Sequence, residues 1–180
     1  MALARYSLAA PAPLARLWPL LVLGPVLTAV TGFPRAGLYL NGWRPDWAFL
    51  LTLFLALRTE SWLAYLGAFV LGFFQGYLSL APPGLFCLKL ALGVLITRGL
   101  ARKLELKGFL PLSLLALCLG GALGLGLEPW LLGLTQSQPS YQFLNEPTLI
   151  IAARTVFVSA LGVAPFFRLL DRLFHPKESP

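Results

Sequence analysis

The sequence predicts an all-α integral membrane protein in which six transmembrane helices form a compact bundle. Of its 180 residues, 58% are hydrophobic and only 12% are charged, and the mean hydropathy is +0.78. Soluble domains are closer to half apolar and a quarter charged, and a chain of this length has too little interior to bury the surplus. The apolar residues form runs separated by short basic clusters, as in membrane proteins. This composition disfavours a disordered chain, a secreted disulfide scaffold and a nucleic-acid-binding domain.

Six apolar runs follow one another, and each is predicted to form one helix. They are residues 17–33, 46–57, 61–80, 83–100, 108–127 and 148–169. The first run lacks a following A-x-A cleavage signature, so we expect a retained helix that is kinked at Pro25 rather than a signal peptide. The second is short for a bilayer, which takes about 20 residues. We expect it to extend back through Trp43 and Pro45, with Trp43 and Trp47 at the membrane interface.

The basic residues predict the side of the membrane that each loop faces. The predicted organisation is a cytoplasmic segment at residues 1–16, a six-helix domain at residues 17–170 and a cytoplasmic tail at residues 171–180. Ten of the 14 Lys and Arg residues then face the cytoplasm and two face outward. Such an excess is typical of cytoplasmic loops, so it favours six crossings with both termini inside. The basic inner face is expected to contact anionic phospholipids, or to dock a cytoplasmic protein.

Small residues recur at four-residue spacing in three of the runs. These stripes are Gly24, Thr28 and Gly32 in the first run, Ala68, Gly72 and Gly76 in the third, and Ala116, Gly120 and Gly124 in the fifth. Lipid gives helices no hydrophobic reason to associate, so close contact of backbones along such stripes provides the packing. Each stripe is expected to pack within the bundle or against the transmembrane helix of a partner.

Two cations lie inside the predicted spans. Lys89, in the fourth run, and Arg154, in the sixth, are expected in the outer third of the membrane. Charge in hydrocarbon is unfavourable, so the two side chains either reach the outer headgroups or converge on an anion. Glu128, Glu146 and the phosphate of a lipid are the anions that we consider.

Groups suited to catalysis or metal binding are scarce. The only histidine, His175, is in the polar tail, and the acidic residues lie at the ends of runs or between them. HExxH, GxSxG and Walker-type patterns are absent from the sequence. We therefore expect no catalytic residue, metal site or cofactor. Gln75 is expected to form an interhelical hydrogen bond, and Cys87 and Cys118 are expected to be small buried side chains.

Short motifs around the second and third runs resemble the rod shape-determining protein MreD family. In that family an R/L-P-D/N element opens the second span, and a short S-G-S-P-L-G-like turn follows the third. Here Arg44-Pro45-Asp46-Trp47 opens the second run, and Ser79-Leu80-Ala81-Pro82-Pro83-Gly84 provides the turn. Pro45, Asp46 and Gly84 carry the match. The resemblance extends over nearly the whole chain in size and number of spans.

One position departs from the family pattern. The usual aspartate of the third span falls at Gly76, with Gln75 beside it, so no role of that acid can be transferred to this chain. The stretch Leu66-Gly67-Ala68-Phe69-Val70-Leu71-Gly72 precedes this position, and Gly72 and Gly84 keep the separation seen in the family.

The resemblance implies a non-enzymatic scaffold subunit of the bacterial cell-elongation (rod) complex in the cytoplasmic (inner) membrane. Such proteins bind the single-pass protein MreC and support side-wall peptidoglycan synthesis and cell shape. The MreB filament and the RodA–transpeptidase synthase are further implied partners. The family is also similar in fold to the S-components of energy-coupling-factor transporters.

Two alternatives remain. The first is a substrate-binding S-component of a vitamin transporter, which would use an outward cavity near Lys89 and Arg154. The second is a membrane enzyme acting on a lipid-linked precursor, which the lack of an acid–base pair of residues disfavours.

Overall fold

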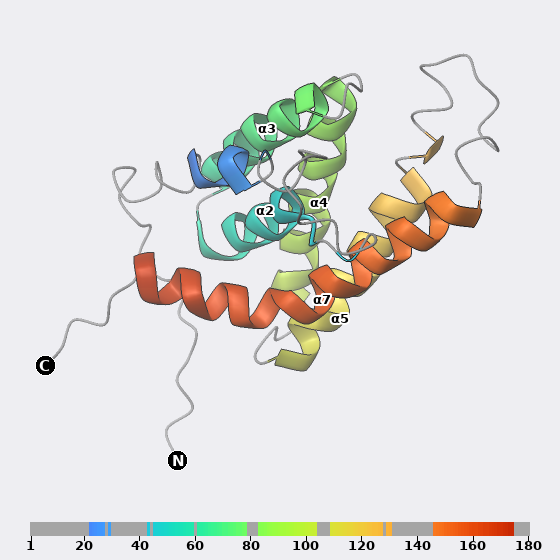
Figure 1. The fold of residues 1–180 in the computed structure, drawn as a ribbon. Coiled ribbons are helices and arrows are strands. Elements are labelled where there is room, and N and C mark those ends of the chain that lie inside the picture. The colour runs from blue at the N-terminus through green and yellow to red at the C-terminus, as the bar shows by residue number, and fades with distance from the viewer. Residues whose placement is uncertain are drawn as a thin grey trace, which may run out of the picture.

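The structure, a computed structural model, is helical over almost all of its described part, which contains no strand. It describes residues 22–27, 29, 43, 45–59, 61–78, 83–103, 109–127, 129–130 and 146–174. Residues 22–27 are helical, and the elements that follow are α2 (Trp47–Arg58), α3 (Ser61–Leu78), α4 (Pro83–Lys103), α5 (Phe109–Gly120), the π-helix η2 (Gly121–Leu127) and α7 (Glu146–Phe174) (Figure 1).

Three helical stretches of the described part are long and apolar enough to cross a membrane. They are Gly84–Lys103, Leu110–Leu127 and Leu149–Leu173, while Trp47–Arg58 and Trp62–Leu78 are shorter apolar helices. All the predicted runs from the second onward coincide with helices. The largest difference is at α7, which continues to Phe174 and so includes part of the predicted tail. Thr28, Gly32 and the predicted segment 1–16 lie outside the described residues.

The shortest of these helices, α2, occupies the centre of the protein. It lies between the α3–α4 pair and the α5–α7 pair (Figure 1). Every residue from Ala48 to Ala56 is buried, so no side of the helix faces lipid over this stretch. Twelve residues make a helix of about 18 Å, well short of the roughly 30 Å of hydrocarbon. Because its neighbours shield it, α2 has no need to match that thickness.

The predicted extension of α2 toward the N-terminus is wrong. Trp43 and Pro45 are not helical, and α2 begins at Trp47 with Asp46 as its N-cap. An N-cap carboxylate satisfies backbone N–H groups that have no partner within the first turn, so the helix can begin inside the protein.

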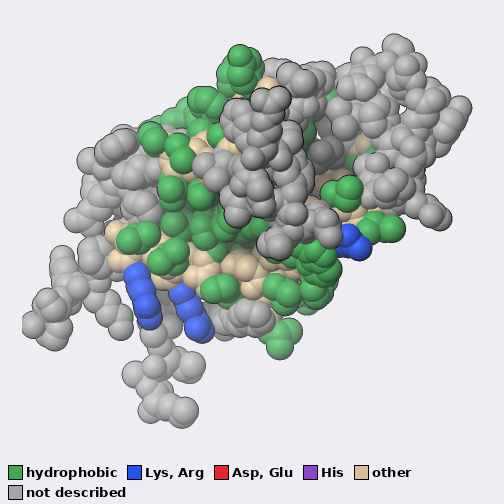
Figure 2. All heavy atoms as spheres, viewed as in Figure 1, with side chains coloured by type: hydrophobic (Ala, Val, Ile, Leu, Met, Phe, Trp, Pro, Cys, Tyr) green, Lys and Arg blue, Asp and Glu red, His purple; other side chains and the backbone are tan. Residues whose placement is uncertain are grey.

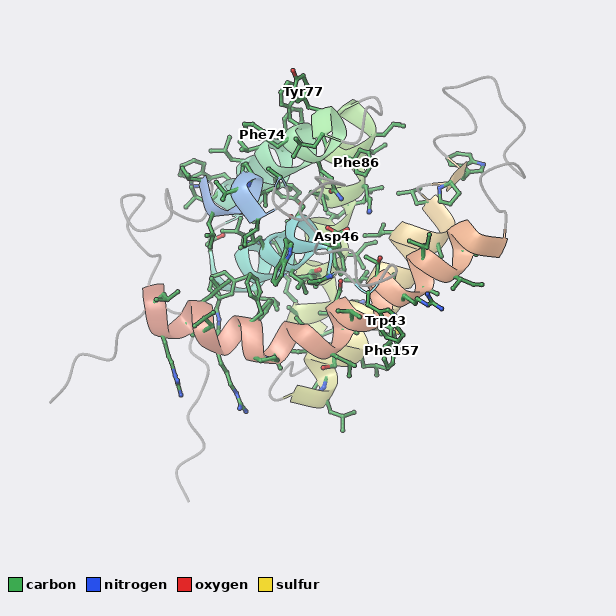
Figure 3. The ribbon with its side chains drawn as sticks, viewed as in Figure 1. Trp43, Asp46, Phe74, Tyr77, Phe86 and Phe157 are labelled. Carbon is green, nitrogen blue, oxygen red and sulfur yellow. The ribbon has the colours of Figure 1, made fainter. Side chains whose placement is uncertain are left out.

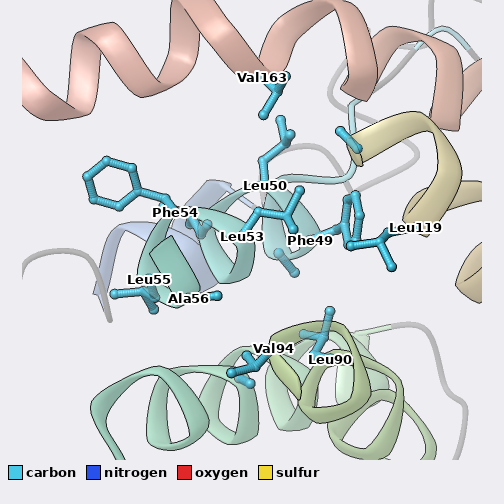
Figure 4. Packing of buried hydrophobic residues seen from close by; sticks show 14 of the residues in the cluster. Phe49, Leu50, Leu53, Phe54, Leu55, Ala56, Leu90, Val94, Leu119 and Val163 are labelled. Atoms are coloured by element: carbon cyan, nitrogen blue, oxygen red, sulfur yellow. The ribbon is translucent and has the colours of Figure 1, made fainter. Parts of the chain in front are cut away.

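The core is built around the apolar side chains of α2, which point toward every neighbouring helix. In Figure 4, Leu50 extends toward Val163 of α7, and Phe49 lies beside Leu119 of α5. The ring of Phe54 meets that of Phe167 edge-on, with the ring centroids 5.3 Å apart. The buried residues of α4 that complete this cluster are Leu90 and Val94.

The stripe of small residues on α3 brings α3 and α4 into backbone contact. Ala68, Gly72 and Gly76 are all buried. A Cβ atom added at Gly72 would lie 2.6 Å from the backbone N and Cα of Cys87. The thiol of Cys87 donates a hydrogen bond to the carbonyl of Phe69 at 3.3 Å. Only glycine at position 72 allows the two backbones to approach this closely.

The other stripes also face helices of the same protein where they are described. A Cβ atom added at Gly24 would meet Leu71 of α3 and Leu51 of α2. On the α5–η2 stretch, Ala116 is fully buried, and Cβ atoms added at Gly120 and Gly124 would meet Val156 of α7. The prediction that Cys118 is buried is wrong, because the residue is exposed on α5, whereas Cys87 is buried as expected.

The outer surface is apolar, as lipid contact requires. Figure 2 shows hydrophobic side chains over much of the face in view. On α3 the large exposed side chains are Trp62, Leu66, Phe69, Phe73, Phe74 and Tyr77. A water-soluble monomer rarely exposes apolar patches of this extent.

Substituting Gly72 with alanine is expected to destabilise the protein by about 1–3 kcal/mol, because the added methyl group would force the α3 and α4 backbones apart. Thermal unfolding in detergent measures the effect. Gly99→Ala in α4 is the matched control, since a Cβ atom there has no neighbour within 4 Å. That variant is expected to keep or raise the unfolding temperature. Equal unfolding temperatures for the two variants would contradict the close contact at Gly72.

Candidate functional site

The N-terminus of α2 is held by a single carboxylate. Oδ1 of Asp46 accepts a hydrogen bond from the backbone N–H of Phe49 at 3.0 Å, and the Asp46 carbonyl accepts one from Leu50 at 3.0 Å. Pro45, directly before the cap, has a fixed φ and no N–H group, which suits the extended backbone that enters a helix. The R-P-D-W sequence therefore encodes a sharp helix start.

The same carboxylate contacts side chains from two other helices. Nε2 of Gln75, from α3, donates to Oδ1 of Asp46 at 3.5 Å, and this confirms the predicted interhelical hydrogen bond. Nζ of Lys89, from α4, lies 3.6 Å from Oδ2. The side chain of Lys89 is only 6% exposed and that of Asp46 17%, so this ion pair is largely removed from solvent and lipid. Lys89 also lies 5.5 Å from the ring centre of Phe86.

The backbone of Asp46 makes a fourth connection, to α7. Its N–H donates to Oγ of Ser159 at 2.8 Å, and that hydroxyl donates to the carbonyl of Thr155 at 2.7 Å. Ser159 is buried. Asp46, Gln75, Lys89 and Ser159 thus join α2, α3, α4 and α7, and we call these four residues the Asp46 junction. Figure 3 shows Asp46 near the centre of the molecule.

The position of Ser159 along α7 indicates how deep in the membrane the Asp46 junction lies. It is near the middle of α7, which runs from Glu146 to Phe174. If α7 crosses the bilayer, the Asp46 junction lies well inside the hydrocarbon rather than at the headgroups. Ionisable groups at such depth are rare, they are paired with one another, and they mark sites of functional interest.

A second polar contact fixes the opposite end of α2. Arg58, the last residue of α2, donates to Asp171 of α7 at 2.7 Å. Arg98 of α4 donates to the carbonyl of Thr59, the C-cap of α2. Both ends of the central helix are therefore attached to α4 and α7, with an apolar stretch between them.

These contacts also give the direction of the helices. The Asp46–Ser159 and Arg58–Asp171 contacts both join residues 113 apart in the sequence. A constant separation means that α2 and α7 run in the same direction. The contacts of Lys89 and Arg98, which lie near the start and the end of α2, give α4 that direction too.

Arg154 lies on the N-terminal side of Ser159 in α7. Its guanidinium is 5.7 Å from the ring centre of Trp43, whose ring meets that of Phe157 edge-on at 6.3 Å (Figure 3). The two intramembrane cations thus have different neighbours, since Lys89 faces Asp46. The side chains of Glu128 and Glu146 lie outside what the structure describes.

The Asp46 junction is suited to holding helices together and poorly suited to catalysis or metal binding. Its one carboxylate is already used as a helix cap and as the partner of Lys89. No group of three or more His, Cys, Asp or Glu residues that could hold a metal occurs in the described part of the chain. Of the sequence-predicted site residues, the structure places Asp46 and Lys89 together, while Gly84 is exposed in the first turn of α4.

The pairing of Asp46 with Lys89 and the role of Ser159 were not predicted from the sequence. The available signal was the presence of two opposite charges in neighbouring apolar runs, Asp46 opening the second and Lys89 in the first half of the fourth. If the second and fourth spans run in the same direction, this places both side chains toward the same membrane face.

A buried polar junction, an apolar exterior and several helices able to cross a bilayer define a helical membrane protein. The profile of the rod shape-determining protein MreD family matches residues 15–173. The chain belongs to the MreD family, which confirms the resemblance seen in its motifs. Membership assigns the protein to the membrane-associated, structural part of the rod-shape machinery. No curated protein and no solved structure matches the chain.

Substituting Lys89 with methionine is expected to lower stability by about 3–5 kcal/mol, because it leaves the carboxylate of Asp46 buried without its cation. Asp46→Asn keeps an N-capping side chain, so the double variant Asp46→Asn/Lys89→Met should recover much of the loss. Unfolding of the wild type, both single variants and the double variant in detergent measures the coupling between the two sites. Strictly additive effects would exclude an energetic role for the ion pair.

Proposed function

We propose that this protein is a non-enzymatic scaffold subunit of the bacterial rod complex, located in the cytoplasmic membrane. Membership of the MreD family over nearly the whole chain is the observation that carries the proposal. The protein supports side-wall peptidoglycan synthesis by binding the transmembrane helix of MreC. MreB and the RodA–transpeptidase synthase are direct or indirect partners.

The directions of the helices support six crossings with both termini in the cytoplasm. The second, fourth and sixth crossings of such a topology run in the same direction, as α2, α4 and α7 do. Their C-terminal ends carry the basic residues Arg58, Arg98, Arg102, Lys103, Arg168 and Arg172. Basic residues favour the cytoplasmic side, so this common end is the inner one.

A scaffold acts by holding its partner proteins in a fixed place. The polar contacts at both ends of α2 tie it to α4 and α7, and a partner helix packed on this bundle would have a fixed place and orientation. The external domain of that partner would then be confined near the synthase. No bond-making step is required of this protein.

The outer face of α3 offers a suitable surface for a partner helix. The small-residue stripes that are described pack inside the protein, so they leave this role to a different surface. Trp62, Leu66, Phe69 and Phe73 are exposed, and their spacing of four, three and four residues is that of the seam in a left-handed helix pair. Large aromatic side chains also contribute strongly to protein interfaces.

Co-expression with MreC tests the proposal. MreC is expected to copurify with this protein in mild detergent and in lipid nanodiscs, and Phe69→Ala/Phe73→Ala is expected to reduce its recovery at least tenfold. Leu114→Ala/Leu117→Ala, which removes two exposed side chains from α5, is the matched control and should retain MreC. Failure of the unmodified protein to retain MreC in either environment would refute the scaffold function. Loss of MreC from both double variants would refute the assignment to α3.

The S-component alternative has less support. An anionic vitamin would need a cation that is available in an outward cavity, but Lys89 already faces Asp46 and Arg154 lies over the ring of Trp43. The similarity in fold to S-components remains a prediction. Retention of a small molecule through purification would favour this alternative.

A further inference from the structure

A shallow, open groove of about 470 Å³ lies along the C-terminal half of α7, on the basic side of the protein, and all of its described lining comes from this one helix. Its described lining residues are Leu161, Ala164, Pro165, Arg168, Leu169 and Arg172. They repeat every three or four residues and so form one continuous face of the helix. The groove is distinct from the contacts between α7 and α2. Those contacts use Ser159 and Asp171, and neither residue lines the groove.

The groove changes in character along its length. Leu161, Pro165 and Leu169 are exposed at successive turns and provide an apolar surface. Arg168 and Arg172, also one turn apart and exposed, provide two positive charges at the end toward the C-terminus. Basic side chains project away from the other helices in this part of α7 (Figures 2 and 3).

No acidic side chain in the described part of the structure pairs with the two arginines. Asp171, which is adjacent in sequence to Arg172, is engaged 2.7 Å from Arg58 of α2. No salt bridge or hydrogen bond joins Arg168 or Arg172 to another described residue. Residues 1–45 contain no Asp or Glu at all, so the N-terminal part of the chain has no acid that could neutralise them.

We propose that this groove binds one anionic phospholipid. The phosphate lies between Arg168 and Arg172, because guanidinium groups donate paired hydrogen bonds to phosphate oxygens. An acyl chain follows the apolar surface from Leu169 toward Leu161. The inference depends on the protein being in a membrane and is independent of any protein partner.

The charge pattern favours a phospholipid over a transmembrane helix as the occupant. A spanning helix from another protein has an apolar middle and needs no pair of cations along one groove. An anionic lipid has its charge at one end and hydrocarbon along the rest, which matches the distribution along α7. Two basic residues near a membrane surface are expected to strengthen binding of an anionic lipid about 30-fold.

Native mass spectrometry of the full-length protein in detergent, with added phosphatidylglycerol, tests the proposal. One phosphatidylglycerol is expected to bind more tightly than phosphatidylcholine with the same acyl chains. Arg168→Gln/Arg172→Gln is expected to weaken its binding about 30-fold. Arg102→Gln/Lys103→Gln is the matched control, because it removes the same charge from exposed positions in the last turn of α4.

A second variant separates the groove from charge alone. Leu161→Trp fills the apolar end without changing the charge, and it should weaken phosphatidylglycerol binding while leaving helix content, measured by circular dichroism, unchanged. Equal binding of the two lipids would overturn the proposal, as would equal losses in the Arg168/Arg172 and Arg102/Lys103 variants. Loss of a copurified membrane protein from the groove variants, with lipid binding intact, would assign the groove to a protein helix instead.

Discussion

The structure depends on one constraint: the central helix is too short to cross the hydrocarbon and is enclosed by its neighbours, so the polar groups at its ends must be satisfied by other side chains. A helix leaves N–H groups without partners at its start and carbonyl groups without partners at its end. In water these groups bind solvent, but in hydrocarbon each unsatisfied group costs several kcal/mol. The carboxylate of Asp46 meets this need at one end of α2, and the guanidinium of Arg98 meets it at the other.

The polar ends and the apolar middle of α2 have different roles. Leucine and phenylalanine side chains fill space and would tolerate small shifts of one helix along another. The contacts with Ser159 and Asp171 both specify the same offset between α2 and α7, so sliding one helix along the other would break them. Buried ion pairs contribute little net stability against an apolar replacement, but they can select one arrangement among several. For a scaffold, a unique arrangement is the property that matters.

The apolar runs predicted the helices well, because length and hydropathy are properties of each segment alone. The small-residue stripes were also informative, and close contact between α3 and α4 at Gly72 follows from the absence of a side chain. The centre of the bundle was harder to predict. A run with apolar residues on all sides shows no preferred face, so the sequence around α2 does not distinguish a lipid-exposed helix from an enclosed one.

The polar contacts escaped prediction for a related reason. Lys89 and Asp46 are 43 positions apart, and pairing them requires knowing that α2 and α4 are adjacent and run in the same direction. The extension of α2 through Trp43 was wrong because we assumed that every span must match the bilayer thickness. A span enclosed by other helices is exempt from that requirement, and an acid at its start then acts as a cap inside the membrane.

The resemblance in motifs predicts an aspartate where this chain has Gly76, and the Asp46 junction gives a reason why glycine suits this position. An aspartate at position 76 would place a carboxylate on α3, one residue beyond Gln75, which already contacts Asp46. Position 76 is buried, and Lys89 is the cation that faces Asp46 in this junction. A buried acid at position 76 would need a cation of its own, and like charges at close range disfavour ionisation of both acids. The neutral amide of Gln75 donates a hydrogen bond to the carboxylate without adding charge. Glycine at position 76 and glutamine at position 75 thus match a junction that contains a single ion pair.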